Sequence, residues 1–380
     1  MKKSILGLMF FFVLLMNTAC WDKKEIENRA YISAIGIDCI EGKENSPGFV
    51  LTYEYPNLAA YGKTGEGEPR FTIAVEGATI SEISRQVATR IENDMFFRHL
   101  KVVIIGEDVA KDQIKLATVL NALDRSPDIG RRIIILIAEG KARDVINTEM
   151  KEKPVIGRFI WDLVQRENVG GRYYTESIGE LFTHLHRSKV AMIGIVMPRE
   201  EELKLAGASI IKDIKMIGKL DETDTTSVLI LREKINNEDV TIIRDSGRYV
   251  ITYIIENFNI EKSMKIKDGS IKFTYDIENE GYIEEYLEPG TIALDTDILD
   301  TKKIKEIEKE LNNEIETKIL NTINKLQDEF ATDIIGIEDY ISKREPDLWK
   351  ELEDNWEEEF RKIDFQVNVN SKIRRVGLTE

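Results

Sequence analysis

Residues 101–137 read KVVIIGEDVAKDQIKLATVLNALDRSPDIGRRIIILI, and this stretch decides the fold class. Two compact apolar runs, Lys101–Ile105 and Arg132–Ile137, predict buried strands. Between them, Val109–Asp124 repeats apolar residues at helical spacing and predicts a helix. Its inward-facing residues are expected to be Ile114, Ala117, Leu120 and Leu123. This strand–helix–strand order predicts a sheet with helices packed on at least one face.

The same alternation continues on both sides of this stretch. Strands are predicted at Ala30–Ile40, Phe49–Tyr55, Phe71–Glu76, Lys189–Met197, Leu205–Asp213 and Lys215–Leu220. Helices are predicted at Ala78–Asn93 and Ala142–Ile146, and Val155–His186 is expected to be mostly helical. The fold class is therefore α+β or mixed α/β, with mixed sheets and packed helices.

The second half of the chain begins with β structure and ends with helices. Strands are predicted at Val228–Arg232, Val240–Arg244, Tyr249–Asn257 and Ser270–Ile277. Thr301–Glu329 predicts a long, highly charged helix that lies on the sheet and turns its charged face to solvent. Shorter helices follow at Asp333–Ser342 and Asp347–Phe360, and a closing strand at Ile363–Val369.

We place a boundary just after Pro198, where a predicted strand ends and the acidic run of residues 200–202 begins. This gives a signal peptide at 1–19, an N-terminal α/β module at 20–198 that can subdivide, a junction at 199–204 and a C-terminal α+β module at 205–380. At about 100–200 residues per domain, the chain is long enough for two or three domains.

The N-terminus has the features of an export signal that ends in a lipid attachment site. Lys2 and Lys3 precede the apolar run Ile5–Met16, which is too short to span a membrane. Cys20 follows small residues, as the lipidated cysteine of a bacterial lipoprotein does, although Asn17 stands where such signals usually carry Leu. The alternative is an ordinary secretory signal in which Cys20 is incidental. Lipid anchoring through Cys20 is the favoured interpretation.

The charge and the cysteine count narrow the possible partners. The formal net charge of −16 repels phosphate backbones and anionic lipid, so nucleic-acid binding is disfavoured. Membrane contact must then come from the anchor rather than from a basic patch. Once Cys20 is modified, only Cys39 remains, and its strand-like surroundings predict a buried, unreactive thiol.

No pattern in the sequence identifies catalytic, cofactor-binding or metal-binding residues. His184 and His186 would point about 200° apart on a helix, and the sequence offers no third ligand beside them. The abundant carboxylates are better explained as a solvated acidic surface than as catalytic pairs. We therefore expect a protein that is not an enzyme and that carries no cofactor and no metal.

Two sets of residues have structural rather than chemical meaning. Gly194, Gly207 and Gly218 lie in or beside predicted strands, where a bulge or a close backbone approach is expected. Trp349 and Trp356 are seven residues apart in one predicted helix and should share a face with Phe360. We expect that aromatic stripe to belong to the core.

Several short motifs along the chain resemble the Ger(x)C family, the lipoprotein C subunits of nutrient germinant receptors in endospore-forming bacteria. The motifs run from end to end: Cys20-Trp21-Asp22, Leu123-Asp124-Arg125-Ser126-Pro127-Asp128-Ile129, Met197-Pro198-Arg199, Gly207-Ala208-Ser209, Asp333-Ile334-Ile335-Gly336 and Pro346-Asp347-Leu348-Trp349-Lys350. The resemblance implies a multi-domain fold of mixed α and β structure, lipidation of Cys20 and a role without catalysis.

The resemblance also implies a location and partners. Members of the family work beside two integral membrane subunits, of the A and B types, and are held by their lipid on the outer face of the spore inner membrane. A tethered acidic body suits a scaffold or adaptor for those subunits. The motifs at the junction and in the C-terminal helices suggest partner contacts at Arg199 and Trp349.

Two other functions remain open from the sequence. A solute-binding lipoprotein of a transporter would share the anchor and the fold class, but it would need a ligand cleft between two similar lobes. An envelope enzyme would need a catalytic motif, and the sequence provides none.

Overall fold

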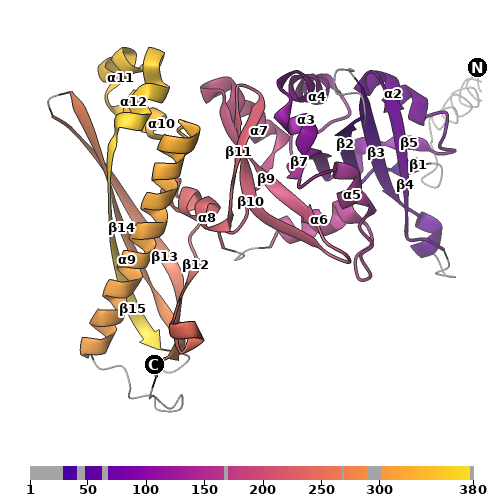
Figure 1. The fold of residues 1–380 in the computed structure, drawn as a ribbon. Helices are drawn as coiled ribbons and strands as arrows, with labels where there is room; N and C mark the ends of the chain where they lie inside the picture. The colour runs from indigo at the N-terminus through magenta and orange to yellow at the C-terminus, as the bar shows by residue number, and fades with distance from the viewer. Residues whose placement is uncertain are drawn as a thin grey trace, which may run out of the picture.

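The computed structural model describes residues 29–40, 48–61, 67–166, 170–267, 269–289 and 301–376. Within them the chain has the expected mixture of α and β structure, with mixed sheets and packed helices. In Figure 1 the large sheet and its helices form one side of the molecule, and a smaller sheet and its long helix form the other.

The larger sheet contains nine strands among the described residues. In spatial order they are β11 (Lys215–Leu220), β10 (Leu203–Lys212), β9 (Val190–Pro198), β7 (Ile134–Ala138), β6 (Val102–Ile105), β2 (Ala34–Cys39), β3 (Phe49–Pro56) and β4 (Arg70–Gly77), with β8 (Glu176–Ser177) paired to β7. The central strands β2, β6, β7 and β9 run parallel, and antiparallel strands flank them on both sides. A separate short pair joins β1 (Arg29–Tyr31) to β5 (Asp94–Phe96).

Helices cover both faces of this sheet. One face packs against α2 (Ile80–Val87), α3 (Glu107–Lys111), α4 (Gln113–Arg125) and α7 (Ile178–Ser188). The other face packs against α5 (Ala142–Asn147) and α6 (Ile156–Val164). The parallel strands β6 and β7 are buried along their whole length, as strands covered on both faces should be.

The helix predicted at Val109–Asp124 is two helices, α3 and α4. Asp112 separates them because its carboxylate accepts the backbone N–H groups of Ile114 and Lys115 and caps α4. The inward position predicted for Ile114 is wrong, since this side chain is 79% exposed. The buried residues of α4 are Leu116, Val119, Leu120 and Leu123.

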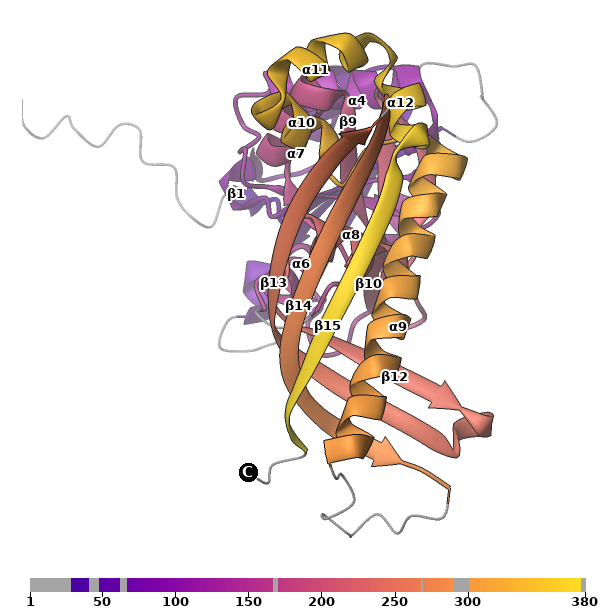
Figure 2. The same ribbon diagram turned by 90° about the vertical axis from the view of Figure 1, so that its left-hand side faces the viewer.

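The smaller sheet has the order β12 (Glu238–Arg244), β13 (Tyr249–Lys267), β14 (Ser270–Leu287) and β15 (Asp364–Val376). Helix α9 (Thr301–Lys325) lies along it, as predicted, and Figure 2 shows α9 beside β15. Its apolar residues Ile307, Leu311, Ile315, Ile319 and Ile323 are buried against the sheet. The chain closes with α10 (Ile337–Arg344), α11 (Pro346–Leu352) and α12 (Trp356–Lys362) ahead of β15.

The segment predicted as a strand at Val228–Arg232 is the end of helix α8 (Glu222–Leu231), so that prediction is wrong. Asp221 caps this helix by accepting the N–H of Asp224. The helix lies between the two sheets, and buried residues cover most of its circumference. A short apolar run with no exposed face does not distinguish a buried helix from a buried strand.

The predicted junction at 199–204 falls on the β9–β10 hairpin: residues 199–202 connect the two strands, and Leu203 and Lys204 already pair with Pro198 and Met197. The nine-stranded sheet therefore continues through it, and β10 and β11 extend that sheet beyond residue 204. The division into modules at this point remains a proposal.

The glycines singled out in the sequence lie where close approaches occur. Gly207 has a φ of +72°, at a register shift between Leu205 and Ala208, which a residue with a side chain would adopt only with strain. A Cβ at Gly194 would collide with the carbonyl oxygen of Tyr174, and one at Gly218 with the ring of Phe330. Cys39 ends β2 half-buried rather than fully buried, and burial raises the pKa of its thiol.

Candidate functional site

Arg199 lies on the surface, in the connection between β9 and β10. Its side chain is 45% exposed, and its guanidinium lies 3.2 Å from a carboxylate oxygen of Glu139. The same group donates to the carbonyl of Pro198 and contacts the sulfur of Met197. Ion pairs at such exposed positions contribute little to stability. Arg199 is thus held in place by weak contacts and remains accessible to a partner.

Trp349 lies on α11, half-buried against the C-terminal core. Its ring stands 5.1 Å from that of Trp356, edge to face, and Trp356 lies 6.1 Å from Phe360. The three aromatic side chains do pack together, but they come from the two short helices α11 and α12 instead of one helix. In the described part of the chain, Arg199 is not among the residues that line the cavity beside Trp349. Cys20 lies outside the described residues.

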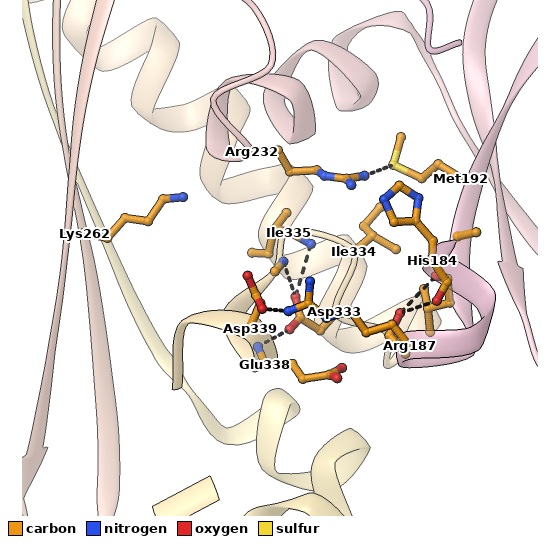
Figure 3. A pocket seen from close by; sticks show the side chains of 14 residues that line it. His184, Arg187, Met192, Arg232, Lys262, Asp333, Ile334, Ile335, Glu338 and Asp339 are labelled. Atoms are coloured by element: carbon orange, nitrogen blue, oxygen red, sulfur yellow. Dashed lines mark hydrogen bonds and ion pairs between the residues drawn. The ribbon is translucent and has the colours of Figure 1, made fainter. Parts of the chain in front are cut away.

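Trp349 lines a cavity of about 540 Å³ between the ends of α7 and β10 and the helices that follow α9. A second cavity, of about 230 Å³, adjoins it and shares the residues Arg187, Ser188, Val190, Asp333 and Glu338 (Figure 3). We call the smaller one the α7 cavity. Both lie where the larger sheet meets the C-terminal helices, so this contact zone is the candidate site.

Charged side chains join the two sides of the zone. Arg187 on α7 forms an ion pair with Asp339 on α10. Lys212 at the end of β10 lies 2.6 Å from Glu357 on α12 and 3.5 Å from the carbonyl of Ala331. These contacts link elements more than 100 residues apart in sequence. They connect α10 and α12 to α7 and to the end of β10.

The motif Asp333–Gly336 has a structural explanation. The Asp333 carboxylate accepts the backbone N–H groups of Ile335, Gly336 and Glu338. Gly336 adopts a φ of +84° immediately before α10, a conformation that suits glycine. Burial raises the pKa of Asp333, against the opposing effect of these N–H groups. This turn starts α10 and forms the floor of the α7 cavity.

His184 on α7 forms a part-buried hydrogen-bonded pair with Glu176. Its Nδ1 lies 3.0 Å from Glu176 Oε2, which also accepts the hydroxyl of Tyr174 at 3.0 Å. Glu176 is only 4% exposed, and burial raises its pKa although the bonds from His184 and Tyr174 act to lower it. His186 engages a different group, the carbonyl of Phe182.

From the sequence, nothing indicated a role for Glu176, Arg187 or Arg232, and His184 was assessed only as a possible metal ligand. Glu176 and Arg232 come together only when the strands of the larger sheet pair and α8 packs beside them, so no local sequence pattern identifies them. Among the described residues, no group of three or more His, Cys, Asp or Glu side chains is placed to hold a metal ion. None of the described helices is both long and apolar enough for a membrane span.

Comparison with known proteins identifies the family. A family model described as "Spore germination protein N-terminal domain" matches residues 22–198, and one described as "Spore germination B3/ GerAC like, C-terminal" matches residues 206–377. These bounds fall on either side of the predicted junction.

Curated relatives match along nearly their whole length. Spore germination protein YndF of Bacillus subtilis (strain 168) is 27% identical over 95% of this chain and 93% of its own. Spore germination protein B3 of the same organism is 25% identical over 99% of both chains. The crystal structure of the GerBC protein has the same fold, with a TM-score of 0.60 over 90% of this chain and 97% of that one, at 20% identity. The chain therefore belongs to the Ger(x)C family of spore germination proteins.

Proposed function

We propose that this protein is a lipid-anchored, non-catalytic subunit of a membrane receptor that triggers spore germination. It would sit on the outer face of the spore inner membrane and act as a scaffold or adaptor for the two integral membrane subunits. The observation that carries the proposal is the presence of both family domains, in order, over nearly the whole chain.

A short tether supports this role. Eight residues lie between Cys20 and Arg29, so the nine Cα–Cα steps that join these two residues span at most about 32 Å when fully extended. Arg29 begins β1, which pairs with β5 at Asp94. The anchor would hold the folded body close to the bilayer and raise its effective concentration near partner subunits. Stable attachment needs more than one acyl chain, and a lipoprotein cysteine carries two or three.

Arg199 and Trp349 are the proposed contact residues. Arginine and tryptophan are enriched among the residues that dominate binding energy at interfaces. Arg199 could exchange its exposed pairing with Glu139 for a partner's carboxylate at little cost. Trp349 borders a cavity that a partner side chain could enter.

The test is co-purification with the membrane subunits from spores that carry Arg199→Glu or Trp349→Ala. Each change should reduce the recovered complex severalfold, because each removes a contact at the interface. Arg158→Glu is the control for the first, since Arg158 is also exposed and paired with a carboxylate. Trp161→Ala, another half-buried tryptophan, is the control for the second. Undiminished recovery of the complex with folded Arg199→Glu and Trp349→Ala proteins would show that these two residues do not contact the partner subunits.

The solute-binding alternative gains no support from the fold. It requires a ligand cleft between two lobes of like topology. Here a nine-stranded mixed sheet with helices on both faces stands beside a four-stranded sheet with one long helix. The two halves are not repeats of one another.

A further inference from the structure

We infer that the α7 cavity binds a small oxyanion, a carboxylate or a phosphate, between Arg232 and His184. Figure 3 shows the Arg232 side chain reaching across the cavity toward Met192 and His184. Neither Arg199 nor Trp349 lines this cavity.

Among the described residues, no carboxylate pairs directly with Arg232, a half-buried cation that interacts electrostatically with the buried Glu176. A guanidinium offers five N–H donors. The contacts that Arg232 makes are the sulfur of Met192 at 3.8 Å and the ring of Tyr174, whose centroid lies 5.9 Å away. A thioether is a weak acceptor, so most of the donors remain available for a ligand. A planar oxyanion matches their geometry.

His184 supplies a second donor on the opposite wall. Its Nδ1 is engaged by Glu176, which leaves Nε2 as the free ring nitrogen. The side chain is 32% exposed and lines the cavity. When Nε2 carries the ring hydrogen, it can donate to an anion in the cavity.

The carboxylates that line the cavity engage groups other than Arg232. Asp333 is occupied by three backbone N–H groups, and Asp339 by Arg187 and Lys343. The carboxylate of Glu338 points away from Arg232 in Figure 3. Lys262 approaches from a third side, with its ammonium group 2.6 Å from Glu233. The charge of Arg232 is therefore only partly compensated, because Glu176, the buried carboxylate that interacts with it, is also bonded to His184 and Tyr174.

Apolar side chains and the size of the cavity restrict the ligand. Ile334, Ile335 and Met192 complete the walls and reduce the local dielectric constant, which strengthens a charge-assisted hydrogen bond. At about 230 Å³ the cavity is below the range of about 300–1,000 Å³ that is usual for larger ligands. An inorganic phosphate or a short-chain carboxylate fits this limit.

An anion here would also join the two family domains. His184 and Met192 lie in the region matched by the N-terminal model, and Arg232 and Asp333 in that matched by the C-terminal model. Occupancy would thus stabilise the contact between α7 and the end of α8. A purely structural explanation exists for Arg232, since a cation at the C-terminus of α8 complements the helix dipole. That explanation predicts no dependence on anions.

The test uses the full-length mature chain in detergent, with acetate, inorganic phosphate or chloride at matched ionic strength. The chain has three histidines, so ¹⁵N-histidine spectra are simple, and His184→Asn assigns the His184 ring signals. Acetate or phosphate should shift the His184 signals saturably and raise the unfolding midpoint by about 2–4 °C. Arg232→Gln should weaken binding at least about tenfold. Arg248→Gln, an exposed change outside the cavity, should leave binding unaltered.

A response to only one of the two oxyanions assigns the site to that chemistry. A response to chloride equal to that of acetate and phosphate is an ionic-strength effect and overturns the inference. So do His184 signals that move no more than those of His99 and His186. Because this comparison is made on the unmodified protein, it stands even if Arg232→Gln fails to fold.

Discussion

Glu316 on α9 accepts a hydrogen bond from the backbone N–H of Val369 on β15, at 2.9 Å. Asn312 and Glu308 do the same for Ser371 and Ile373, at 2.7 and 3.0 Å. Three polar side chains, one helical turn apart, thus satisfy alternate N–H groups along the outer edge of β15. An unpaired strand edge invites pairing with other chains, and this helix covers it.

Glu316→Ala should lower the free energy of unfolding by about 1–3 kcal/mol, because it leaves a half-buried N–H without its charged acceptor. Combined replacement of Glu308, Asn312 and Glu316 by Ala should also promote self-association through the exposed edge. Urea unfolding and size-exclusion chromatography measure the two effects. Glu314→Ala on the same helix, which removes only an exposed pair with Lys318, should change stability by less than about 0.5 kcal/mol. Equal effects of Glu316→Ala and Glu314→Ala would contradict this role.

Glu54 should be among the most sensitive positions in the larger sheet. Its buried carboxylate pairs with Arg70 at 2.7 Å and accepts N–H groups from Ile156 and Gly157 at the start of α6. Glu54→Ala leaves Arg70 without its charge partner and should cost about 3–5 kcal/mol by denaturant unfolding. Glu76→Ala on neighbouring β4 removes an exposed carboxylate and serves as the control. A loss below 1 kcal/mol at Glu54 would show that water replaces these bonds.

Glu107 should make stability depend on pH in the acid range. Burial opposes ionisation, but hydrogen bonds from Lys111, Lys219 and the N–H of Gly140 lower the pKa of Glu107 to about 2. Because the folded-state pKa lies below the unfolded one, the stabilisation is complete above about pH 4.5 and is lost as the pH falls toward 2. After allowance for solvent screening, Glu107→Gln should cost about 1–2 kcal/mol at pH 7.

The measurement is the difference in unfolding free energy between the parent protein and Glu107→Gln at pH 7, 4 and 3. This difference should shrink as the pH falls. Asp108→Asn, a change at the exposed neighbouring carboxylate, should show no such trend. A difference that stays constant down to pH 3 is incompatible with the assignment.

Gly194→Ala should destabilise the centre of the larger sheet. The new methyl group would meet the backbone oxygen of Tyr174, which cannot move aside as a flexible side chain could. We expect a loss of about 2–3 kcal/mol in the free energy of unfolding. Gly130→Ala is the matched control, since its nearest neighbour would be Ile133 at 3.8 Å. Thermal unfolding of both variants decides the point, and equal midpoints would count against the close approach.

The sequence predicted the fold class, most strands of the larger sheet and the apolar face of α9, because each depends on a strong local period. It placed Ile114 inside because the apolar pattern of 109–124 can be read as one helix. The capping by Asp112, which breaks that helix, shifts the buried face to Leu116 and Val119. A capping residue inside a periodic run is easily overlooked.

Strands β13 and β14 are both much longer than predicted, and for β13 the reason is a change of phase. Up to Ile255 the buried side chains occupy odd positions. After the register shift between Ile255 and Asn257, the half-buried side chains, such as Phe258 and Ile260, occupy even positions. The change of phase hides the continuation of the strand from a period-two search. The α7 cavity was beyond prediction, because it forms only when α7, the end of α8, β13 and the Asp333 turn meet in three dimensions.

The central claim is that Cys20 holds this protein at the membrane as part of a germination receptor. It is tested most directly by fractionating spores that carry Cys20→Ala and assaying their germination with a panel of nutrients. The account predicts that the variant leaves the membrane fraction and that nutrient-triggered germination slows, while the unmodified protein restores both. Membrane retention of the variant together with normal germination would contradict it.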